Sequence, residues 1–179
     1  MEHLNLDDWQ PQVLALGEAL RARRWRMASA ESCTGGLVAA ACTSVAGSSD
    51  WFERGFVTYS NDAKVQMLGV PAELIATHGA VSEPVARAML AGALAAAPVQ
   101  LAVAVTGIAG PGGAVPGKPV GTVWLAWGTA TEVHAERLQL AGDRTAVRGR
   151  TVHAALRRLL DVVGASNVPG ASNAASAGG

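Results

Sequence analysis

Three polar segments of this chain carry residue types that could perform acyl transfer. They are residues 31–36 (Glu-Ser-Cys-Thr-Gly-Gly), 59–64 (Tyr-Ser-Asn-Asp-Ala-Lys) and 106–111 (Thr-Gly-Ile-Ala-Gly-Pro). Each lies where a predicted strand gives way to a loop or a helix. Ligands in open α/β sheets bind outside the carboxyl ends of strands, so we expect the three segments to converge on one site.

The first segment places a hydroxyl, Ser32, at the predicted N-terminus of a helix. The free N–H groups and the dipole of such a terminus favour an anion, and glycines let a ligand approach the backbone closely. We therefore predict that Ser32 is a nucleophile and that the backbone around it stabilises an oxyanion. The backbone donors would come from Cys33, Thr34, Gly35 and Gly36. The alternative is that Ser32 or Thr34 is an ordinary N-cap and the glycines serve helix packing.

The second segment contains Tyr59, the only tyrosine of the chain, and Lys64. Lys64 is predicted to lie about one turn inside a helix capped by Ser60 or Asn61. A cation in the first turn opposes the helix dipole, which lowers the lysine pKa as a general base requires, but this effect is only about 0.3–1 kcal/mol. Burial must supply most of the shift, so we expect Lys64 to line a closed pocket rather than project into solvent. The alternative is a solvated lysine on the helix surface.

The third segment follows an apolar run at 101–105 that is typical of a strand buried on both faces. Backbone N–H groups in a glycine-rich loop of this kind can bind an anion. The candidate residues are Thr106, Gly107, Ile108, Ala109 and Gly110. An ordinary connection between two elements is the alternative.

Alternating helices and strands must position these segments. Hydrophobic periodicity and capping residues predict helices at 9–24, 34–43, 61–68 and 71–77, from Ser82 to Pro98, and after Asp143. Strands are predicted at 26–30, 52–60, 101–105, 120–128 and 132–140, the last two as a hairpin. This order implies an α/β fold, a three-layer α/β/α sandwich around a mixed, mostly parallel sheet.

Composition limits the classes of protein that the chain could be. The 179 residues suit one domain, predicted at 1–164, followed by a disordered tail at 165–179 that lacks large apolar side chains. The net charge of zero argues against nucleic-acid binding. No apolar run reaches the ~18 residues of a membrane span, and residues 1–6 do not resemble a signal peptide, so we expect no membrane association and a cytoplasmic protein.

The cysteines and histidines do not suggest a metal or a disulfide. Cys33 and Cys42 are expected on one helix, where nine residues correspond to about 13 Å, too far for a disulfide. No ligand spacing typical of zinc is present, so we expect neither a metal nor an organic cofactor.

Eight motifs in the same order resemble the CinA C-terminal domain family over about residues 9–163. They are residues 31–36, Gly-Ser-Ser at 47–49, residues 52–61, Lys64, His-Gly-Ala-Val-Ser-Glu-Pro at 78–84, residues 106–111, Lys-Pro-Val-Gly-Thr at 118–122, and Gly-Asp-Arg at 142–144. The resemblance implies a three-layer α/β/α sandwich, a homodimer and, for stand-alone members, nicotinamide-nucleotide amidase activity.

The same resemblance implies a small-molecule nucleotide substrate, nicotinamide mononucleotide, hydrolysed to nicotinic acid mononucleotide and ammonia. It places the family's catalytic serine, tyrosine and lysine on Ser32, Tyr59 and Lys64. The Ser32 proton would pass to Lys64 directly or through Tyr59. Donors for the substrate phosphate are expected from Arg144 and Arg148, which lie one helical turn apart, and from the backbone at 106–110.

Three alternatives stay open from sequence. Cys33 could replace Ser32 as nucleophile, because thiols are intrinsically stronger. The substrate could be another pyridine nucleotide or amide. The chain could also be a non-catalytic regulatory or binding module related to competence or DNA damage, although the joint presence of Ser32, Tyr59 and Lys64 argues for catalysis.

The two nucleophiles are separated by a pair of alanine substitutions. Ser32→Ala should abolish ammonia release from nicotinamide mononucleotide, since it removes the covalent path, whereas Cys33→Ala should keep most activity. Turnover of both purified variants is measured by ammonia release. Wild-type-like turnover of Ser32→Ala, or an inactive Cys33→Ala, would contradict the assignment.

Overall fold

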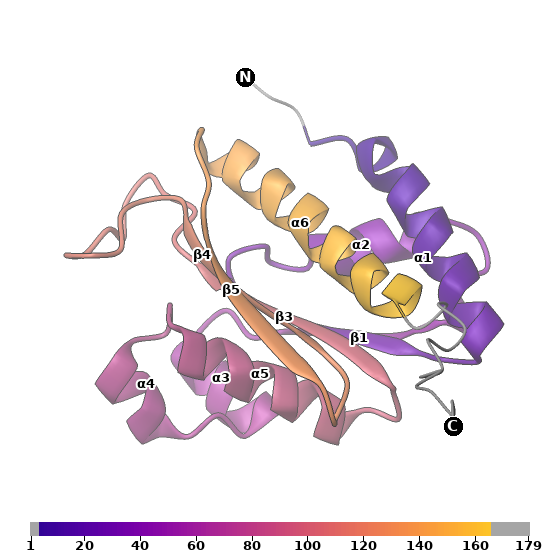
Figure 1. Cartoon of the computed structure of the whole chain (residues 1–179). Helices are drawn as coiled ribbons and strands as arrows, with labels where there is room; N and C mark the ends of the chain where they lie inside the picture. Colours follow the sequence, from indigo (N-terminus) through magenta and orange to yellow (C-terminus); the bar gives the residue numbers. More distant parts are fainter. Residues whose placement is uncertain (1–3, 166–179) are drawn as a thin grey trace, which may run out of the picture.

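The computed structural model describes residues 4–165, which fold into three layers (Figure 1). Helices α1 (Gln10–Arg23), α2 (Leu37–Thr43) and α6 (Arg144–Ala165) cover one face of a central sheet. Helices α3 (Asn61–Leu68), α4 (Ala72–His78) and α5 (Glu83–Ala96) cover the other face. Short 3-10 helices at Leu6–Trp9 and Ser48–Asp50 precede α1 and the second strand. The three-layer α/β/α prediction is therefore confirmed.

The sheet of the described chain has the order β2-β1-β3-β4-β5. Its strands are β1 (Met27–Glu31), β2 (Phe52–Val57), β3 (Leu101–Gly107), β4 (Thr122–Gly128) and β5 (Val133–Gln139). β1 pairs in parallel with both β2 and β3, while β4 pairs antiparallel with β3 and β5. The mixed sheet is thus as predicted, and the carboxyl ends of β2, β1 and β3 lie side by side at one edge.

Alternation along the strands divides the core between the two faces. Met27 of β1 and Val103 of β3 pack in the cluster beneath α1, α2 and α6, while Ala28 and Ala104 belong to the cluster against α5. Successive side chains of a strand point to opposite faces, so residues just beyond β1 should also diverge. Glu31 and Ser32 are therefore directed toward different helical layers.

Four predicted boundaries shift by a few residues. α2 begins at Leu37 rather than at Thr34, because Gly35 and Gly36 adopt positive φ values of 60° and 94° that a helix cannot contain. β2 ends at Val57, β3 extends to Gly107, and β4 begins at Thr122. Cys33 consequently lies before the helix instead of on it.

Two further predictions concern the cysteines and the tail. Cys33 and Cys42 are both free and buried. The tail predicted at 165–179 lies outside the described residues, apart from Ala165, with which α6 ends.

Among residues 4–165, no helix combines the length and the apolar character that crossing a membrane would take.

A glycine in α5 sets how closely this helix approaches α3. A Cβ atom on Gly92 would overlap the carbonyl oxygen of Leu68, whereas a Cβ atom on Gly164 of α6 would meet nothing within 4 Å. Gly92→Ala should lower the free energy of unfolding by about 1–3 kcal/mol through overpacking, although alanine is the better helix former. Gly164→Ala is the matched control and should be neutral or slightly stabilising. Urea titrations of both variants make the comparison, and equal stabilities would contradict this packing.

Candidate active site

Ser32 and Lys64 meet in the interior at the carboxyl end of β1. The Lys64 side chain is 1% exposed, and its Nζ lies 3.1 Å from Ser32 Oγ. The carbonyl oxygens of Thr58 and Ser60 accept further hydrogen bonds from Nζ at 2.8 and 3.4 Å. The solvated lysine considered from the sequence is therefore wrong, and the hydroxyl and the amine form one buried pair.

Local structure accounts for the direction of Lys64. Ser60 caps α3, its Oγ accepting from the N–H of Ala63 at 3.0 Å, as predicted. The N–H of Thr58 donates to the Glu31 carbonyl at 2.8 Å, which keeps the chain beside β1 after β2 has ended. The first turn of α3 is thereby fixed across the end of β1, and Lys64 reaches Ser32 from there.

Burial lowers the pKa of Lys64 from its ordinary value, because the charged ammonium loses its hydration. Within the described chain no carboxylate forms an ion pair with Lys64 to oppose this. A neutral amine has two hydrogens, which the Thr58 and Ser60 carbonyls can accept. Its lone pair then faces Ser32 Oγ, which is the arrangement that a general base requires.

The carboxylate of Glu31 is fully buried and fixes the turn that carries Ser32. It accepts hydrogen bonds from the N–H groups of Gly36, Val38 and Ala39 at 2.9–3.0 Å and from Ser29 Oγ at 3.0 Å. The N-terminus of α2 therefore binds the carboxylate of Glu31 rather than an anionic ligand. Ser32 lies before that terminus and points to the opposite layer.

The hydrogen bonds to Glu31 change which backbone N–H groups could stabilise an oxyanion. The N–H of Gly36 is bonded to Glu31, and that of Gly35 donates to the Ser32 carbonyl at 3.0 Å. In the described part of the chain, the N–H groups of Cys33 and Thr34 donate to no other residue. The predicted set of donors therefore reduces to these two.

Cys33 packs in the core rather than in the site. Its side chain is 6% exposed, and burial is the main cause that raises the pKa of its thiol to about 12. A Cβ atom on Gly107 would lie 3.0 Å from Cys33 Sγ, so the sulfur fills the space beneath the loop after β3. A thiol with this pKa stays protonated at neutral pH, and only the thiolate is a strong nucleophile.

Tyr59 and Arg144 form a bridge above the end of β1. Arg144 Nη2 donates to Tyr59 Oη at 2.8 Å, and Nη1 donates to the Gly110 carbonyl at 2.9 Å. Tyr59 follows β2, Gly110 follows β3, and β1 lies between these strands. The guanidinium therefore spans the strand that leads to Ser32. The Tyr59 ring is 59% exposed, so it offers a surface to a ligand.

Arg148 contacts the turn itself, because its Nη2 donates to the Thr34 carbonyl at 2.8 Å. Arg148 Nε and Thr34 Oγ1 are both buried, and no hydrogen-bond partner for either atom lies among residues 4–165. Arg144 and Arg148 thus hold two different loops of the site. Unsatisfied buried groups of this kind call for a partner, which a polar ligand can supply.

The remaining predicted residues lie around this centre with varied roles. Thr106 Oγ1 donates to the Ala80 carbonyl at 2.8 Å, so its proton is not available to an oxyanion. Ile108 and Ala109 are buried and support the loop, whereas the Asn61 side chain is exposed at the start of α3. The structure therefore brings Ser32 and Lys64 together at the turn after β1. Thr106 instead holds the segment that contains Ala80.

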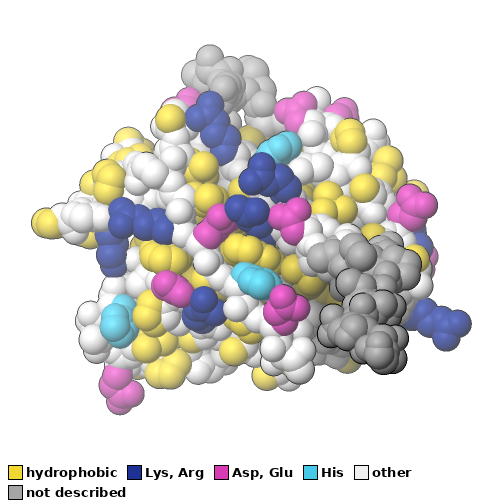
Figure 2. All heavy atoms as spheres, in the orientation of Figure 1, with side chains coloured by type: hydrophobic (Ala, Val, Ile, Leu, Met, Phe, Trp, Pro, Cys, Tyr) yellow, Lys and Arg dark blue, Asp and Glu magenta, His cyan; other side chains and the backbone are white. Residues whose placement is uncertain are grey.

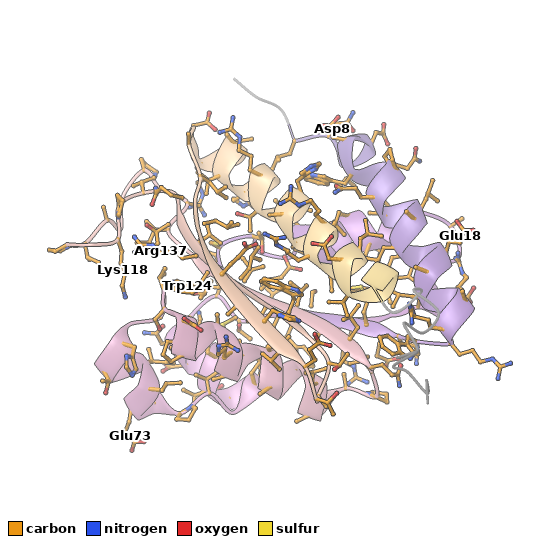
Figure 3. The ribbon with its side chains drawn as sticks, viewed as in Figure 1. Asp8, Glu18, Glu73, Lys118, Trp124 and Arg137 are labelled. Atoms are coloured by element: carbon orange, nitrogen blue, oxygen red, sulfur yellow. The ribbon has the colours of Figure 1, made fainter. Side chains whose placement is uncertain are left out.

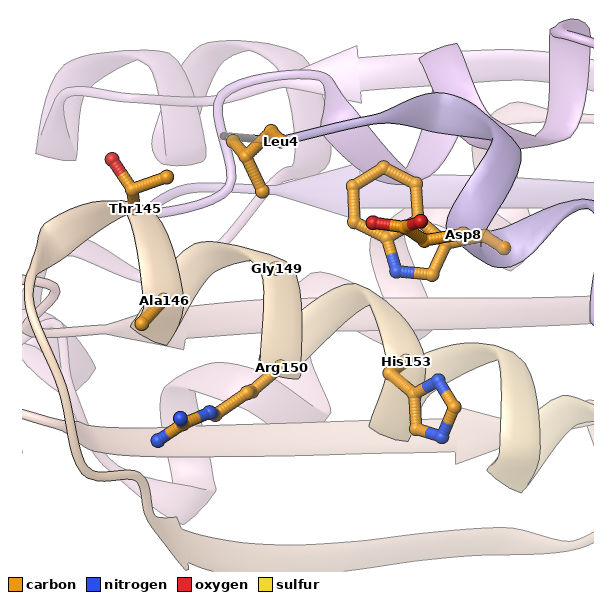
Figure 4. A pocket seen from close by; sticks show the side chains of 8 residues that line it. Leu4, Asp8, Thr145, Ala146, Gly149, Arg150 and His153 are labelled. Carbon is orange, nitrogen blue, oxygen red and sulfur yellow. The ribbon is translucent and has the colours of Figure 1, made fainter. Parts of the chain in front are cut away.

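Two cavities are relevant to the position of the site. One of about 450 Å³ borders Arg144 and Ala109 beside the bridge. Another, of about 380 Å³, lies between the N-terminal segment and α6, where Leu4 and Asp8 face Arg150 and His153 (Figure 4). This second cavity contains none of the predicted catalytic residues. No cluster of three or more potential metal ligands occurs in the described chain.

Sequence reasoning missed the function of Glu31. Glu31 begins the 31–36 motif, but the motif pattern predicts no contact for its carboxylate. The available signal was its place at the end of a small, uncharged strand segment, Met-Ala-Ser-Ala, directly before the turn. A charge in that position is buried and must be met by hydrogen bonds.

Comparisons with known proteins identify the family of the chain and several relatives. Residues 10–163 match the CinA C-terminal domain family. The "Nicotinamide-nucleotide amidohydrolase PncC" of Pseudomonas putida is 56% identical over 147 residues, which cover 82% of this chain and 92% of that protein. The protein of the same name from Escherichia coli K12 is 56% identical over 145 residues, covering 80% and 88%. The crystal structure of the competence/damage inducible protein CihA from Agrobacterium tumefaciens superposes with a TM-score of 0.85 at 43% identity, covering 89% and 98%.

Replacing Glu31 by glutamine tests the anchoring contact. The amide would present N–H groups to backbone donors that now bind a carboxylate, so Glu31→Gln should lower the free energy of unfolding by about 2–3 kcal/mol. Glu18→Gln, an exposed change on α1 (Figure 3), is the matched control and should stay within about 0.5 kcal/mol of wild type. Chemical denaturation measures both, and an unaffected Glu31→Gln would show that the contact is dispensable.

Proposed function

The chain belongs to the CinA C-terminal domain family, and from this premise we propose that it is an amidase that hydrolyses the carboxamide of nicotinamide mononucleotide. The products are nicotinic acid mononucleotide and ammonia, which places the reaction in the recycling of pyridine nucleotides. Two relatives at 56% identity carry the name of this activity. The observation that carries the proposal is the buried contact between Lys64 Nζ and Ser32 Oγ.

In the proposed first step, neutral Lys64 takes the hydroxyl proton of Ser32 as the oxygen attacks the carboxamide carbon. A C–O bond forms, and the carbonyl π pair moves onto the oxygen. The N–H groups of Cys33 and Thr34 follow Ser32 directly in the chain and are bonded to no other described residue, so we assign the oxyanion to them. The lowered pKa of Lys64 supports its part in this step.

The collapse of the tetrahedral intermediate then breaks the C–N bond. Lys64, now an ammonium, returns its proton to the departing nitrogen, and ammonia leaves an ester on Ser32. Water then adds to the ester carbon as Lys64 accepts its proton. The bond from that carbon to Ser32 Oγ breaks, Lys64 returns the proton to Ser32 Oγ, and nicotinic acid mononucleotide leaves. No step needs a metal or an organic cofactor.

Tyr59, Arg144 and Arg148 are proposed to bind the rest of the nucleotide. The exposed Tyr59 ring can stack on a pyridine, while the two guanidinium groups supply positive charge for the phosphate. Arg144 donates a hydrogen bond to Tyr59 Oη, which orients the tyrosine for this purpose. The direct contact of Lys64 Nζ with Ser32 Oγ supports direct proton transfer over a route through Tyr59. Asn61 and the backbone of Gly107 to Gly110 complete the proposed rim of the site.

A regulatory or binding module is the second candidate function, since the Agrobacterium tumefaciens structure is named for competence or damage induction. A purely binding role does not explain why Lys64 is buried against Ser32 with no counter-charge among residues 4–165. Burial of an unpaired amine costs stability, and such costs are typical of catalytic sites.

Three further sequence predictions stay proposals. They are a single domain over residues 1–164, a homodimer, and a cytoplasmic location. Light scattering after gel filtration tests the homodimer directly.

The function itself is tested with a panel of amides. Ammonia release should be fastest with nicotinamide mononucleotide and slower with the riboside that lacks the phosphate, because Arg144 and Arg148 then have no anion to bind. Free nicotinamide should react more slowly still. If no amide in the panel releases ammonia, the amidase proposal fails; if another amide is clearly preferred, only the substrate assignment fails.

Substitutions of Lys64 test the base. Lys64→Met keeps the length of the side chain but cannot accept a proton, and Lys64→Arg keeps the charge but does not deprotonate. Both should lower the rate of ammonia release by about 100-fold or more, while the Lys64→Met protein should remain folded. Lys118→Met, which removes the other lysine of the chain, is the matched control and should keep wild-type turnover.

The pH dependence follows from the lowered pKa of Lys64. The neutral amine is the reactive form, so the rate should rise with pH through that pKa and fall away on the acid side. NMR of ¹³C-labelled lysine resolves the two side chains, with Lys118→Met giving the assignment. A Lys64 signal that titrates at the ordinary lysine value, or near-normal turnover of Lys64→Arg, would exclude the lysine as base.

A further inference from the structure

A second basic pocket lies beside the site, at the base of the loop between β3 and β4. Its cavity of about 330 Å³ is bounded by the N-terminus of α5, by that loop and by β4 and β5. Lys118, Trp124 and Arg137 come together there (Figure 3). Dark blue side chains gather on this part of the surface beside the projecting loop (Figure 2).

The two cations of this pocket are fixed in place without being neutralised. Lys118 Nζ donates to the His78 carbonyl at 2.8 Å, and Arg137 Nη2 donates to the Gly117 carbonyl at 2.7 Å. Neither cation forms an ion pair with a carboxylate anywhere in residues 4–165. Carbonyl oxygens orient a cation but leave its charge, so the pocket keeps two positive charges for an anion.

The N-terminus of α5 adds to this positive field. Ser82 occupies the capping position, yet no side chain caps the helix, and Ser82 Oγ donates instead to the Gly79 carbonyl at 2.8 Å. The carboxylate of the pocket, Glu83, is already bound to Arg87 at 2.8 Å. A 14-residue helix therefore directs its positive end into a cavity that already contains Lys118 and Arg137.

Trp124 supplies a flat apolar wall. It is half-buried on β4, opposite Thr106 on one side and Arg137 on the other. An indole next to fixed cations is suited to a planar ring that carries an anionic group, because the ring stacks while the anion pairs.

We propose that this pocket is a second ligand site, which binds a phosphate-bearing small molecule with a planar ring, such as a nucleoside monophosphate. Its phosphate lies between Lys118, Arg137 and the N-terminus of α5, and its ring lies against Trp124. The site is separate from the Ser32–Lys64 pair. The residues that line this cavity do not include Ser32, Lys64 or Tyr59.

NMR of the tryptophan indole groups provides a direct test. The chain has five tryptophans, so the indole N–H region is simple, and Trp124→Phe assigns the relevant signal. Titration of the full-length protein with adenosine monophosphate should shift the Trp124 signal saturably. Inorganic phosphate should compete at least ~10-fold more weakly, because it has no ring to stack on the indole.

Charge-removing variants locate the binding. The double variant Lys118→Met with Arg137→Gln should weaken binding of adenosine monophosphate by at least ~10-fold. Arg157→Gln, an exposed change on α6, is the control for loss of positive charge and should bind as wild type. Ser32→Ala should also bind as wild type, so the outcome does not depend on the proposed amidase activity.

Several results would overturn the proposal. They are a Trp124 signal that does not move at millimolar nucleotide, a shift that persists unchanged in the double variant, and equal affinities for phosphate and nucleotide. If the folded double variant loses turnover of nicotinamide mononucleotide, the pocket is part of the catalytic site, and the proposal of a second, separate site is wrong. Unchanged turnover together with lost nucleotide binding supports a second site.

Discussion

Four hydrogen bonds to the buried carboxylate of Glu31 hold the turn after β1 in a shape that backbone pairing alone would not give it. The carboxylate satisfies the N-terminus of α2, so the chain can make two left-handed glycine steps before the helix begins. Strand alternation directs Glu31 toward α2 and Ser32 toward α3. One residue thus anchors the turn on one side of the sheet, while its neighbour is presented to Lys64 on the other.

The same arrangement keeps charge away from the lysine. Within the described residues, the carboxylate binds backbone and hydroxyl donors rather than an ammonium, and Lys64 meets only uncharged oxygens. A buried ion pair would have raised the pKa of the lysine and kept it protonated, so no free amine would be present to accept a proton. The core therefore tolerates an uncompensated carboxylate, held by dipoles, and a lysine whose neutral form is favoured by burial. In the proposed mechanism, the separation of these two groups leaves Lys64 able to accept the Ser32 proton.

Periodicity and capping predicted the layers, the mixed sheet and the junctions at which the site lies, because these follow from local preferences. Ser60 as the cap of α3 was foreseen for the same reason. The contact of Glu31 with α2 was not foreseen. It depends on the positive φ values of Gly35 and Gly36, which bring the N-terminus of α2 back to the Glu31 carboxylate. The burial of Lys64 is expected from the lowered pKa that a general base needs, and the structure confirms it. The partners of Lys64 and the bond from Thr106 to Ala80 join elements distant in sequence, and no spacing rule encodes them.

The Tyr59–Arg144 bridge has a consequence for the timing of ligand exchange. Both side chains are exposed, and a hydrogen bond between solvated groups contributes only about 0.5–1.5 kcal/mol. Exposed side chains change rotamer in picoseconds to nanoseconds, whereas a typical enzyme turns over about ten times per second. The bridge therefore opens and closes many times within one catalytic cycle. The bridge orders the two side chains at the entrance of the site on average, but it does not block the passage of a ligand. The deeper contacts govern the residence time of a bound nucleotide.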